Sequence, residues 1–479
     1  MATYQTVMTT ALSTGCEMSR RLKPTSDQAN IIESIADDAS GGTLFAGQMG
    51  VGKTLVATEV VYRLAARRVL IVCPKSTVGF ADKESDEYDG WIGTFATQYP
   101  GMKPHVIKKR SDVVPGDGLF IIGREMVAAI TKDTKKEPGV NWSKVQPYDV
   151  VVYDEIHFIG NRKSKAFKAS MTLPAKKRAG LSGTPFRTKF DYAWAVCRFL
   201  WPNDNESVSK SYWTWRYQYC AVETQVFGQQ RVERVVGEKN SGEFFGQLPS
   251  YHRLTAKKRA VTKRLYVELS PAQRRAYREM EDMAVAWLND REEPLVASLP
   301  LVKRIRLREM TLGLPSVDNS TGTPILTFED DCASSKLAAL DDFLIGHEGQ
   351  LLVFTHSQKF AVVAAKRLNA AIWTGKSSDS ERAEAKRQFL AGEKQILVAT
   401  PRSFGTGTDG LQHVCDTMVF LSRDSDTDNI QAIARLDRTG QKSPNVSVID
   451  IVARDTYDEG DLSKEARSVL AMHKSLRDN

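Results

Sequence analysis

Two stretches of the sequence carry residues whose types and spacing could do chemistry. The run DVVVYDEIHFIG places two adjacent carboxylates, Asp154 and Glu155, and a histidine, His157, at the end of an apolar segment. Such a group could ligate a hydrolytic metal, form half of a nucleotide site, or be the polar end of a strand. The zinc interpretation is the weaker one, because an HExxH pair is absent and only one histidine lies nearby.

The second stretch is GQMGVGKT, residues 47–54, which has the spacing of a phosphate-binding loop. It follows the apolar run TLFA and opens a segment of helical periodicity, which is the context that such a loop requires. Glycines let backbone N–H groups close around phosphates, the lysine reaches the β and γ oxygens, and the threonine hydroxyl can hold Mg²⁺. The expected ATP contacts are Gly47, Gly50, Val51, Gly52, Lys53 and Thr54.

A phosphate-binding loop also needs a carboxylate at the tip of a neighbouring strand to position Mg²⁺, and a base to activate water. Asp154 and Glu155 supply both. We therefore expect Thr54 and Asp154 to be the metal ligands and Glu155 to be the catalytic base. A nucleotide site is thus favoured over a metal hydrolase and over a mere strand end.

Short apolar runs separated by amphipathic stretches must position these residues. Between residues 42 and 183 the runs TLFAG, RRVLIVCP, GLFIIG and DVVVYDE resemble buried parallel strands, and KTLVATEVVYRLAARR has helical spacing. A second array follows residue 314, with helices expected at SSKLAALDDFL and SQKFAVVAAKRLNA and strands at QLLVFTH, KQILVAT, DTMVFLS and NVSVIDIVA. The predicted fold class is α/β, with two doubly wound parallel-sheet lobes.

The predicted domains are an N-terminal arm (1–21), a first lobe (22–202), a helical insertion and linker (203–317) and a second lobe (318–479). The insertion is rich in aromatic and basic residues, as in SYWTWRYQYC and YHRLTAKKRAVTKR. Its aromatic residues Trp213, Trp215, Tyr217 and Tyr219 could stack on bases. Alternation within a strand, or packing of the insertion, is the favoured interpretation.

Composition restricts the class of protein. The chain has 479 residues, a formal net charge of +8 and a pI near 9.0, which indicates a mild preference for polyanions. No apolar run approaches the ~18 residues that a membrane span requires. The six cysteines are scattered without a CxxC pair, and the N-terminus lacks a secretory signal pattern, so a reducing cytosol fits best.

With DEIH as motif II, the chain resembles the superfamily 2 helicases, and within them a Swi/Snf-type translocase. The other motifs of that group can be read in order as PTSDQ (glutamine motif), VLIVCPKS (Ia), GLSGTPFRT (III), QLLVFTH (IV), VATPRSFGTGTDG (V) and QAIARLDRTGQ (VI). The resemblance runs from about residue 22 to residue 459. Motif V departs from the family in its longer spacing to Asp416, and the glutamine motif is closer to the DEAD-box form.

The resemblance implies two RecA-like lobes that bind ATP and Mg²⁺, with further site residues. Gln28 would read adenine, and Gly407 and Asp409 would complete the nucleotide site. Arg435 and Arg438 lie three apart on an expected helical face, so both could act as arginine fingers when the second lobe closes on the first. The residues expected to couple hydrolysis to movement are His157, Ser182, Thr184 and Gln431.

Family members hold nucleic-acid backbones with motifs Ia, IV and V, and the matching positions are Lys75, Ser76, Thr400 and Arg402. The basic cluster Lys257, Lys258 and Arg259 is a second candidate, because clustered cations neutralise phosphates. The expected function is an ATP-driven motor on double-stranded or branched DNA, acting in branch migration or fork remodelling in repair or recombination. A strand-separating DNA or RNA helicase and a non-motor, ATP-switched scaffold are the alternatives.

The expected protein is a monomer with DNA as its partner, RNA being the other candidate, and without a membrane association. The compact size resembles phage and bacterial members of the group. We therefore expect it in a bacterial or phage-infected cytosol, or in the nucleus if the source is eukaryotic.

Overall fold

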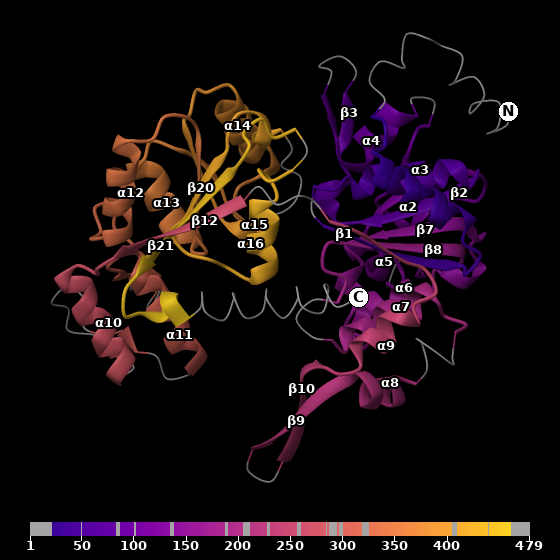
Figure 1. Cartoon of the computed structure of the whole chain (residues 1–479), viewed down its shortest axis with the longest axis horizontal. Coiled ribbons are helices and arrows are strands. Elements are labelled where there is room, and N and C mark those ends of the chain that lie inside the picture. Colours follow the sequence, from indigo (N-terminus) through magenta and orange to yellow (C-terminus); the bar gives the residue numbers. More distant parts are fainter. Residues whose placement is uncertain are drawn as a thin grey trace. The chain divides into compact units, whose positions relative to one another are not determined.

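The computed structural model describes residues 22–48, 50–82, 87–99, 102–134, 138–186, 190–204, 211–227, 230–255, 260–283, 285–286, 295–296, 300–318, 325–404, 410–438 and 440–460. The chain forms two compact units, which meet in the sequence between residues 256 and 257. Each unit is built around its own parallel sheet (Figure 1). This confirms the predicted fold class of two parallel-sheet α/β lobes.

The sheet of the first unit has seven strands, and every neighbouring pair in it is parallel. In spatial order the strands are β11 (Tyr251–Leu254), β1 (Gly42–Gly47), β8 (Ala175–Ser182), β7 (Tyr148–Asp154), β2 (Arg68–Cys73), β6 (Gly118–Gly123) and β5 (His105–Ile107). In parallel strands the carboxyl ends lie at one edge of the sheet. The ends of β1, β8 and β7 are therefore neighbours at that edge, although they lie far apart in the sequence.

Both faces of this sheet are covered by helices, so the middle residues of the central strands β7 and β2 are apolar and buried. Alternate residues of β2 enter opposite cores: Leu70 and Val72 join one, and Val69, Ile71 and Cys73 join the other. The helices on the Leu70 side include α5 (Arg124–Ile130), α6 (Lys165–Ser170) and α7 (Tyr192–Leu200). Those on the opposite side are α2 (Ser26–Asp37), α3 (Lys53–Arg63) and α4 (Gly90–Gln98).

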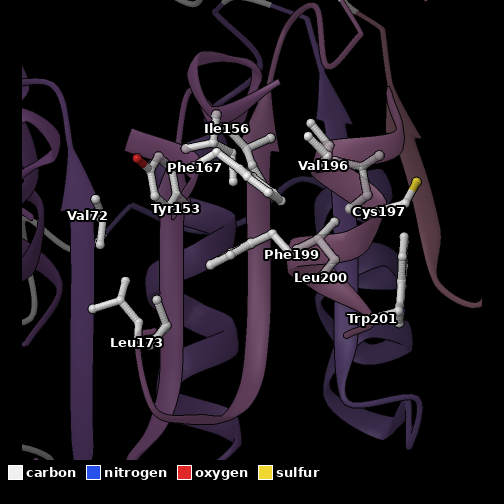
Figure 2. Close-up of a cluster of buried hydrophobic side chains, with 14 of the residues drawn as sticks. Val72, Tyr153, Ile156, Phe167, Leu173, Val196, Cys197, Phe199, Leu200 and Trp201 are labelled. Atoms are coloured by element: carbon white, nitrogen blue, oxygen red, sulfur yellow. The ribbon is translucent and has the colours of Figure 1, made fainter. Parts of the chain in front are cut away.

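Helix α7 shows how one core is filled. Its side chains Val196, Phe199 and Leu200 are buried in one core with Tyr153 of β7 and Ile156, the residues on either side of the two DEIH carboxylates (Figure 2). The rings of Tyr153 and Phe199 meet edge-on with centroids 5.6 Å apart. This packing holds the end of β7 in place, and β7 carries the DEIH residues.

The second unit repeats the plan with a six-stranded sheet in which neighbouring strands are again parallel. In spatial order its strands are β12 (Ala260–Val267), β21 (Val446–Ala453), β20 (Thr417–Phe420), β17 (Leu351–Phe354), β19 (Ile396–Ala399) and β18 (Ala371–Trp373). Its helices are α10 (Pro271–Met283), α11 (Pro300–Leu312), α12 (Ser335–Ile345), α13 (Gln358–Arg367), α14 (Asp379–Leu390), α15 (Pro401–Phe404) and α16 (Asp426–Ile433).

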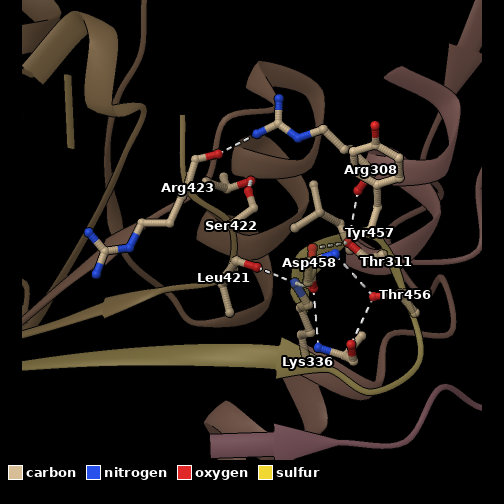
Figure 3. Close-up of polar contacts among 12 residues, drawn as sticks. Arg308, Thr311, Lys336, Leu421, Ser422, Arg423, Thr456, Tyr457 and Asp458 are labelled. Atoms are coloured by element: carbon tan, nitrogen blue, oxygen red, sulfur yellow. Dashed lines mark hydrogen bonds and ion pairs between the residues drawn. The ribbon is translucent and has the colours of Figure 1, made fainter. Parts of the chain in front are cut away.

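A buried lysine fastens the helices of this unit to the segment after β21 (Figure 3). Lys336 of α12 has no exposed surface, and its Nζ donates to the Leu421 carbonyl at 2.5 Å and pairs with Asp458 Oδ2 at 2.5 Å. Thr311 of α11 donates to Asp458 Oδ1 at 3.1 Å. A buried ammonium is costly unless it is paired and hydrogen-bonded, so these contacts favour one packing of α11, α12 and the segment after β21.

Residues 203–317, expected as one helical insertion, contribute to both units. They contain α8 (Tyr212–Tyr219), the hairpin β9 (Cys220–Phe227) and β10 (Gln230–Glu238), and α9 (Ser241–Gly246), and they supply the edge strands β11 and β12. The hairpin extends away from the body of the first unit (Figure 1). Among the described residues there are also three short strand pairs: β3 (Phe80–Asp82) with β4 (Glu87–Asp89), β13 (Val285–Ala286) with β14 (Leu295–Val296), and β15 (Ser316–Asp318) with β16 (Ile325–Thr327).

The expectation of strand alternation for the YWTWRYQY stripe is wrong, because these residues form α8. The Ser211 hydroxyl caps the helix by accepting from the Thr214 amide. Trp215 and Tyr219, four residues apart, then face the core together, so the packing interpretation is correct for this pair. Within the described residues, no helix is long and apolar enough to cross a membrane.

Candidate active site

The phosphate-binding loop leaves the end of β1 and enters the first turn of α3, as predicted. Gly50 and Gly52 have φ of 81° and 76°, a left-handed conformation that only glycine adopts at little cost. A Cβ on Gly47 would lie 2.8 Å from Cγ of Lys53. Larger residues at these positions would therefore strain the loop or displace the lysine.

Lys53 begins α3 and points back across the loop. Its Nζ donates to the carbonyls of Gly47 at 3.0 Å and Gln48 at 3.3 Å. The ammonium also favours the ionised forms of Asp154 and Glu155, although burial and the Glu155 charge outweigh its effect on the pKa of Asp154. The structure thus brings the loop lysine and the two DEIH carboxylates together, as the sequence predicted.

Asp154 is the last residue of β7 and is buried. One of its oxygens accepts from the Trp91 indole at 3.1 Å, and the other accepts from the Glu155 amide at 3.0 Å. Glu155 follows with φ of 51°, an unusual conformation for a non-glycine residue. Such local strain is found mainly where the surrounding structure imposes it, often at functional sites.

The two carboxyls are buried together, and their pKa values shift in opposite directions. Burial and the neighbouring Glu155 charge raise the pKa of Asp154. Burial also opposes ionisation of Glu155, but the hydrogen bond from His157 and the Lys53 charge outweigh it and lower the pKa of Glu155. Glu155 is therefore held as a carboxylate, the form in which a base can accept a proton.

His157 and Ser182 connect the end of β7 to the end of β8. His157 Nδ1 lies 2.8 Å from Ser182 Oγ and 3.1 Å from Glu155 Oε2, and Ser182 Oγ lies 3.4 Å from the same Glu155 oxygen. The Thr184 amide donates to Ser182 Oγ at 3.1 Å. Three of the four residues expected to couple hydrolysis to movement thus form one network around the Glu155 carboxylate.

Gln28 has both ends of its amide engaged inside the protein. Its Oε1 accepts from the Thr25 amide at 2.8 Å, forming a capping box at the start of α2, and its Nε2 donates to the Val51 carbonyl at 2.7 Å. These bonds connect α2 directly to the phosphate-binding loop. A role in reading adenine stays a prediction, and it would require an exchange of these partners.

The residues expected to hold Mg²⁺ suit that ion. Thr54 supplies a hydroxyl at the start of α3, and Asp154 supplies a carboxylate whose pKa is raised by burial and by repulsion from the adjacent Glu155 charge. A cation beside Asp154 would relieve that repulsion. Mg²⁺ commonly takes one or two protein oxygens and completes its shell with water and substrate phosphates.

The residues expected to contact nucleic acid differ in accessibility. Lys75 and Ser76 are exposed in a short 3₁₀ helix, Lys75–Thr77, after β2, and Arg402 is exposed in α15. Thr400 is only 3% exposed, and its hydroxyl shares a hydrogen bond with Ser403 at 2.7 Å. The predicted residues Lys257, Lys258, Arg259, Gly407 and Asp409 lie outside the described residues.

The prediction that Arg435 and Arg438 share one helical face is wrong. Helix α16 carries Gln431 but ends at Ile433, and both arginines follow it in turns. The Gln441 side chain donates to the carbonyls of Leu436 at 3.2 Å and Cys415 at 3.0 Å. In a continued helix the Leu436 carbonyl would accept from a backbone amide. Here the Gln441 side chain donates to it instead, so the helix can end and the chain can turn.

Trp91 is a site residue that the sequence did not reveal. It lies in α4, is 1% exposed, and is the indole donor to Asp154. A tryptophan in an apolar helix gives no signal beyond core packing. Only the fold shows that this side chain reaches the end of β7.

Comparison with known proteins agrees with this geometry. Residues 28–311, more than half of the chain, match the SNF2-related domain, and residues 335–440 match the helicase conserved C-terminal domain. The chain belongs to the SNF2-related family. It carries both the SNF2-related domain and the helicase conserved C-terminal domain.

Among curated proteins, one similar relative is SWI/SNF-related matrix-associated actin-dependent regulator of chromatin subfamily A member 1 of Mus musculus. The two are 24% identical over 463 residues, which is 90% of this chain and 41% of the relative. The DNA repair and recombination protein RAD54 of Oryza sativa is 26% identical over 178 residues, 35% of this chain and 17% of that protein. The chain thus spans less than half the length of these relatives.

Among solved structures, the Sulfolobus solfataricus SWI2/SNF2 ATPase core in complex with dsDNA is similar to the chain at 18% identity and a TM-score of 0.40. The match covers 96% of this chain and 94% of that one.

Proposed function

We propose that the chain is an ATP-driven translocase on double-stranded DNA that remodels branched or forked DNA. The observation that carries this proposal is the grouping of Lys53, Asp154 and Glu155 with the His157 and Ser182 network at one edge of the first sheet. Such a group is suited to hydrolyse a nucleoside triphosphate and to transmit the event along β8. Two findings support DNA as the polymer along which the protein moves. The chain belongs to the SNF2-related family, and the similar rice protein is named as a DNA repair and recombination protein.

In this mechanism Lys53 and the loop amides bind the ATP phosphates, and Gly50 and Gly52 let the loop backbone approach them. Glu155, held ionised by His157 and Lys53, accepts the proton of the attacking water. Thr54 and Asp154 would hold Mg²⁺, which would supply positive charge to neutralise the phosphates.

Arg435 and Arg438 are proposed to stabilise the transition state as arginine fingers supplied in cis. Gly407 and Asp409 are proposed to complete the nucleotide site. Gln431 is proposed to couple hydrolysis to movement. Lys75, Ser76, Thr400, Arg402 and the cluster Lys257, Lys258 and Arg259 are proposed as phosphate contacts of the DNA. The protein is proposed to act as a monomer. Its proposed location is a bacterial or phage-infected cytosol, or the nucleus if the source is eukaryotic.

The test measures ATP hydrolysis with single-stranded, blunt double-stranded and branched DNA, and with RNA. We expect double-stranded DNA to stimulate hydrolysis with little sequence preference, because the backbone is what such a motor holds. The enzyme should also displace the third strand of a triplex and leave a blunt duplex unseparated. Stimulation by single strands or RNA alone, together with unwinding of a tailed duplex, would instead establish a strand-separating helicase.

A further inference from the structure

Helix α8 divides its aromatic side chains between the core and the surface. Trp215 and Tyr219 are fully buried and pack around Phe244, with ring centroids 5.6 Å and 5.4 Å from it. Trp213 and Tyr217 are 65% and 82% exposed. Residues four apart share one helix face, so the second pair forms an aromatic patch to which core packing assigns no role.

Cations from three segments lie over this patch. The Arg162 guanidinium, in the turn before α6, lies 5.6 Å from the Trp213 ring centroid, and Arg216 of α8 lies at the same distance. Lys239, which follows β10, places its Nζ 4.8 Å from the Tyr217 ring centroid. We call Trp213 and Tyr217 with these three cations the α8 aromatic surface.

The surroundings of the α8 aromatic surface are basic. The turn that carries Arg162 continues into exposed Lys163, and exposed Lys165 and Lys168 follow in α6. The nearby carboxylates have partners of their own: Glu233 pairs with Arg216 at 2.6 Å, and Glu243 accepts from Gln218 at 2.6 Å. Arg216 and Glu233 offset each other's charge, so the positive charge near the rings comes from Arg162 and Lys239, with Lys163, Lys165 and Lys168 on the adjoining turn and helix.

We propose that the α8 aromatic surface binds unpaired nucleotides of a single DNA strand. Exposed aromatic rings stack on bases of any sequence, and flanking cations contact the phosphates between them. A blunt duplex offers no free base face, because its bases are already stacked on one another. A protein partner with an acidic surface would use the cations but would leave the exposed rings without an obvious ligand.

This inference rests on the proposed function and deepens it. A translocase that binds only the backbone of double-stranded DNA makes the same contacts on a fork and on a plain duplex. These contacts therefore do not distinguish the two. The α8 aromatic surface would add this distinction, because a fork or branch point carries unpaired bases and a blunt duplex does not.

The experiment uses the full chain and fluorescein-labelled DNA as a single strand, a blunt duplex and a fork with one unpaired arm. Affinities are measured by fluorescence anisotropy at one salt concentration. The double variant Trp213→Ala with Tyr217→Ala should weaken binding of the single strand and the fork at least about tenfold, because two stacking platforms are removed. Its affinity for the blunt duplex should change less than about twofold, since phosphate contacts elsewhere dominate there.

Two matched variants separate stacking from a structural role. Trp213→Phe with Tyr217→Phe keeps two aromatic rings and should bind all three DNAs within about twofold of the wild type. Ile345→Ala removes an apolar side chain of α12 that is 87% exposed, and it should change none of the affinities.

A third variant tests the cations. Lys163→Ala with Lys165→Ala should weaken single-strand binding and reduce the salt dependence of that binding by about one ion per lysine.

Unchanged single-strand and fork affinity in the alanine variant would overturn the proposal and would assign the surface to a protein partner. An equal loss on all three DNAs would also overturn it, because the effect would then be electrostatic or structural. Failure of the proposed function is a separate result. It would be seen as a wild type whose hydrolysis does not respond to blunt duplex, whatever the variants do to single-strand binding.

Discussion

The segment that carries the phosphate-binding residues and the segment that carries the proposed arginine fingers are built differently. In the first unit, Lys53, Asp154 and Glu155 lie at the carboxyl edge of one sheet and are linked through hydrogen bonds and charge to residues on β7 and β8. In the second unit, Arg435 and Arg438 follow the end of α16 in turns. The residues of the first unit are therefore held at the ends of strands, whereas the two arginines lie in a connecting segment.

This difference indicates a division of labour. Groups anchored on buried strands are held close to one geometry, which suits phosphate binding and proton transfer. Arginines on connecting turns suit a contact that is completed only when ATP is bound. Variants in the first set should therefore abolish turnover, and variants in the second should reduce its rate without a comparable change in ATP affinity.

The largest effect is expected for Lys53→Ala. Loss of the ammonium removes a contact to the phosphates, so ATP turnover should fall at least about a hundredfold, to background. The fold should persist, because the lysine amine donates to the Gly47 and Gln48 carbonyls of its own loop and is not part of a hydrophobic core. ATPase assays and thermal unfolding measure the two effects, with the exposed-lysine variant Lys376→Ala as control. Unchanged hydrolysis would contradict the phosphate-loop assignment.

Glu155→Gln should lower turnover by about a hundredfold to ten-thousandfold while ATP binding persists. The amide has the size of the carboxylate but cannot take a proton from the attacking water. Fluorescent-nucleotide binding and single-turnover hydrolysis would separate the two steps. If this variant also fails to bind ATP, Glu155 acts in binding and the anchored set has a different division of roles.

Arg435→Ala and Arg438→Ala should each lower kcat by about tenfold to a thousandfold, with KM for ATP changed much less. The reason is that a finger contributes mainly to the transition state, and two neighbouring arginines can share that task. Steady-state kinetics with saturating duplex DNA provides the measurement. Wild-type kcat in both variants would remove the second unit from the catalytic site.

The smallest effect is expected for Trp91→Phe, which deletes the hydrogen bond to Asp154 and keeps most of the packing. ATPase activity should fall about fivefold or less, with more Mg²⁺ needed for the half-maximal rate. Trp142→Phe is the matched control, because it deletes a buried indole bond to Thr131 elsewhere in the same unit. If both variants show the same change in Mg²⁺ dependence, Trp91 does not act through Asp154.

Much of the fold could be predicted because apolar runs and helical periodicity are local properties of the chain. The strands that carry the loop and the DEIH residues lie where the sequence placed them, and so do the six elements expected in the second array. The sequence did not predict the edge strands β11 and β12, because their segment is rich in basic and aromatic residues and has no clear strand pattern. They become strands by pairing with β1 and β21.

The sequence by itself determined which residues can do the chemistry of the first unit. The loop GQMGVGKT and the pair Asp154 and Glu155 follow from residue type and spacing, because phosphate binding and proton transfer demand those groups. Only the tertiary structure decided that Trp91 supports Asp154, that α16 ends before Arg435, and that Trp213 is exposed while Trp215 is buried. These outcomes depend on which surfaces meet when distant segments pack, and local sequence patterns carry no record of those contacts.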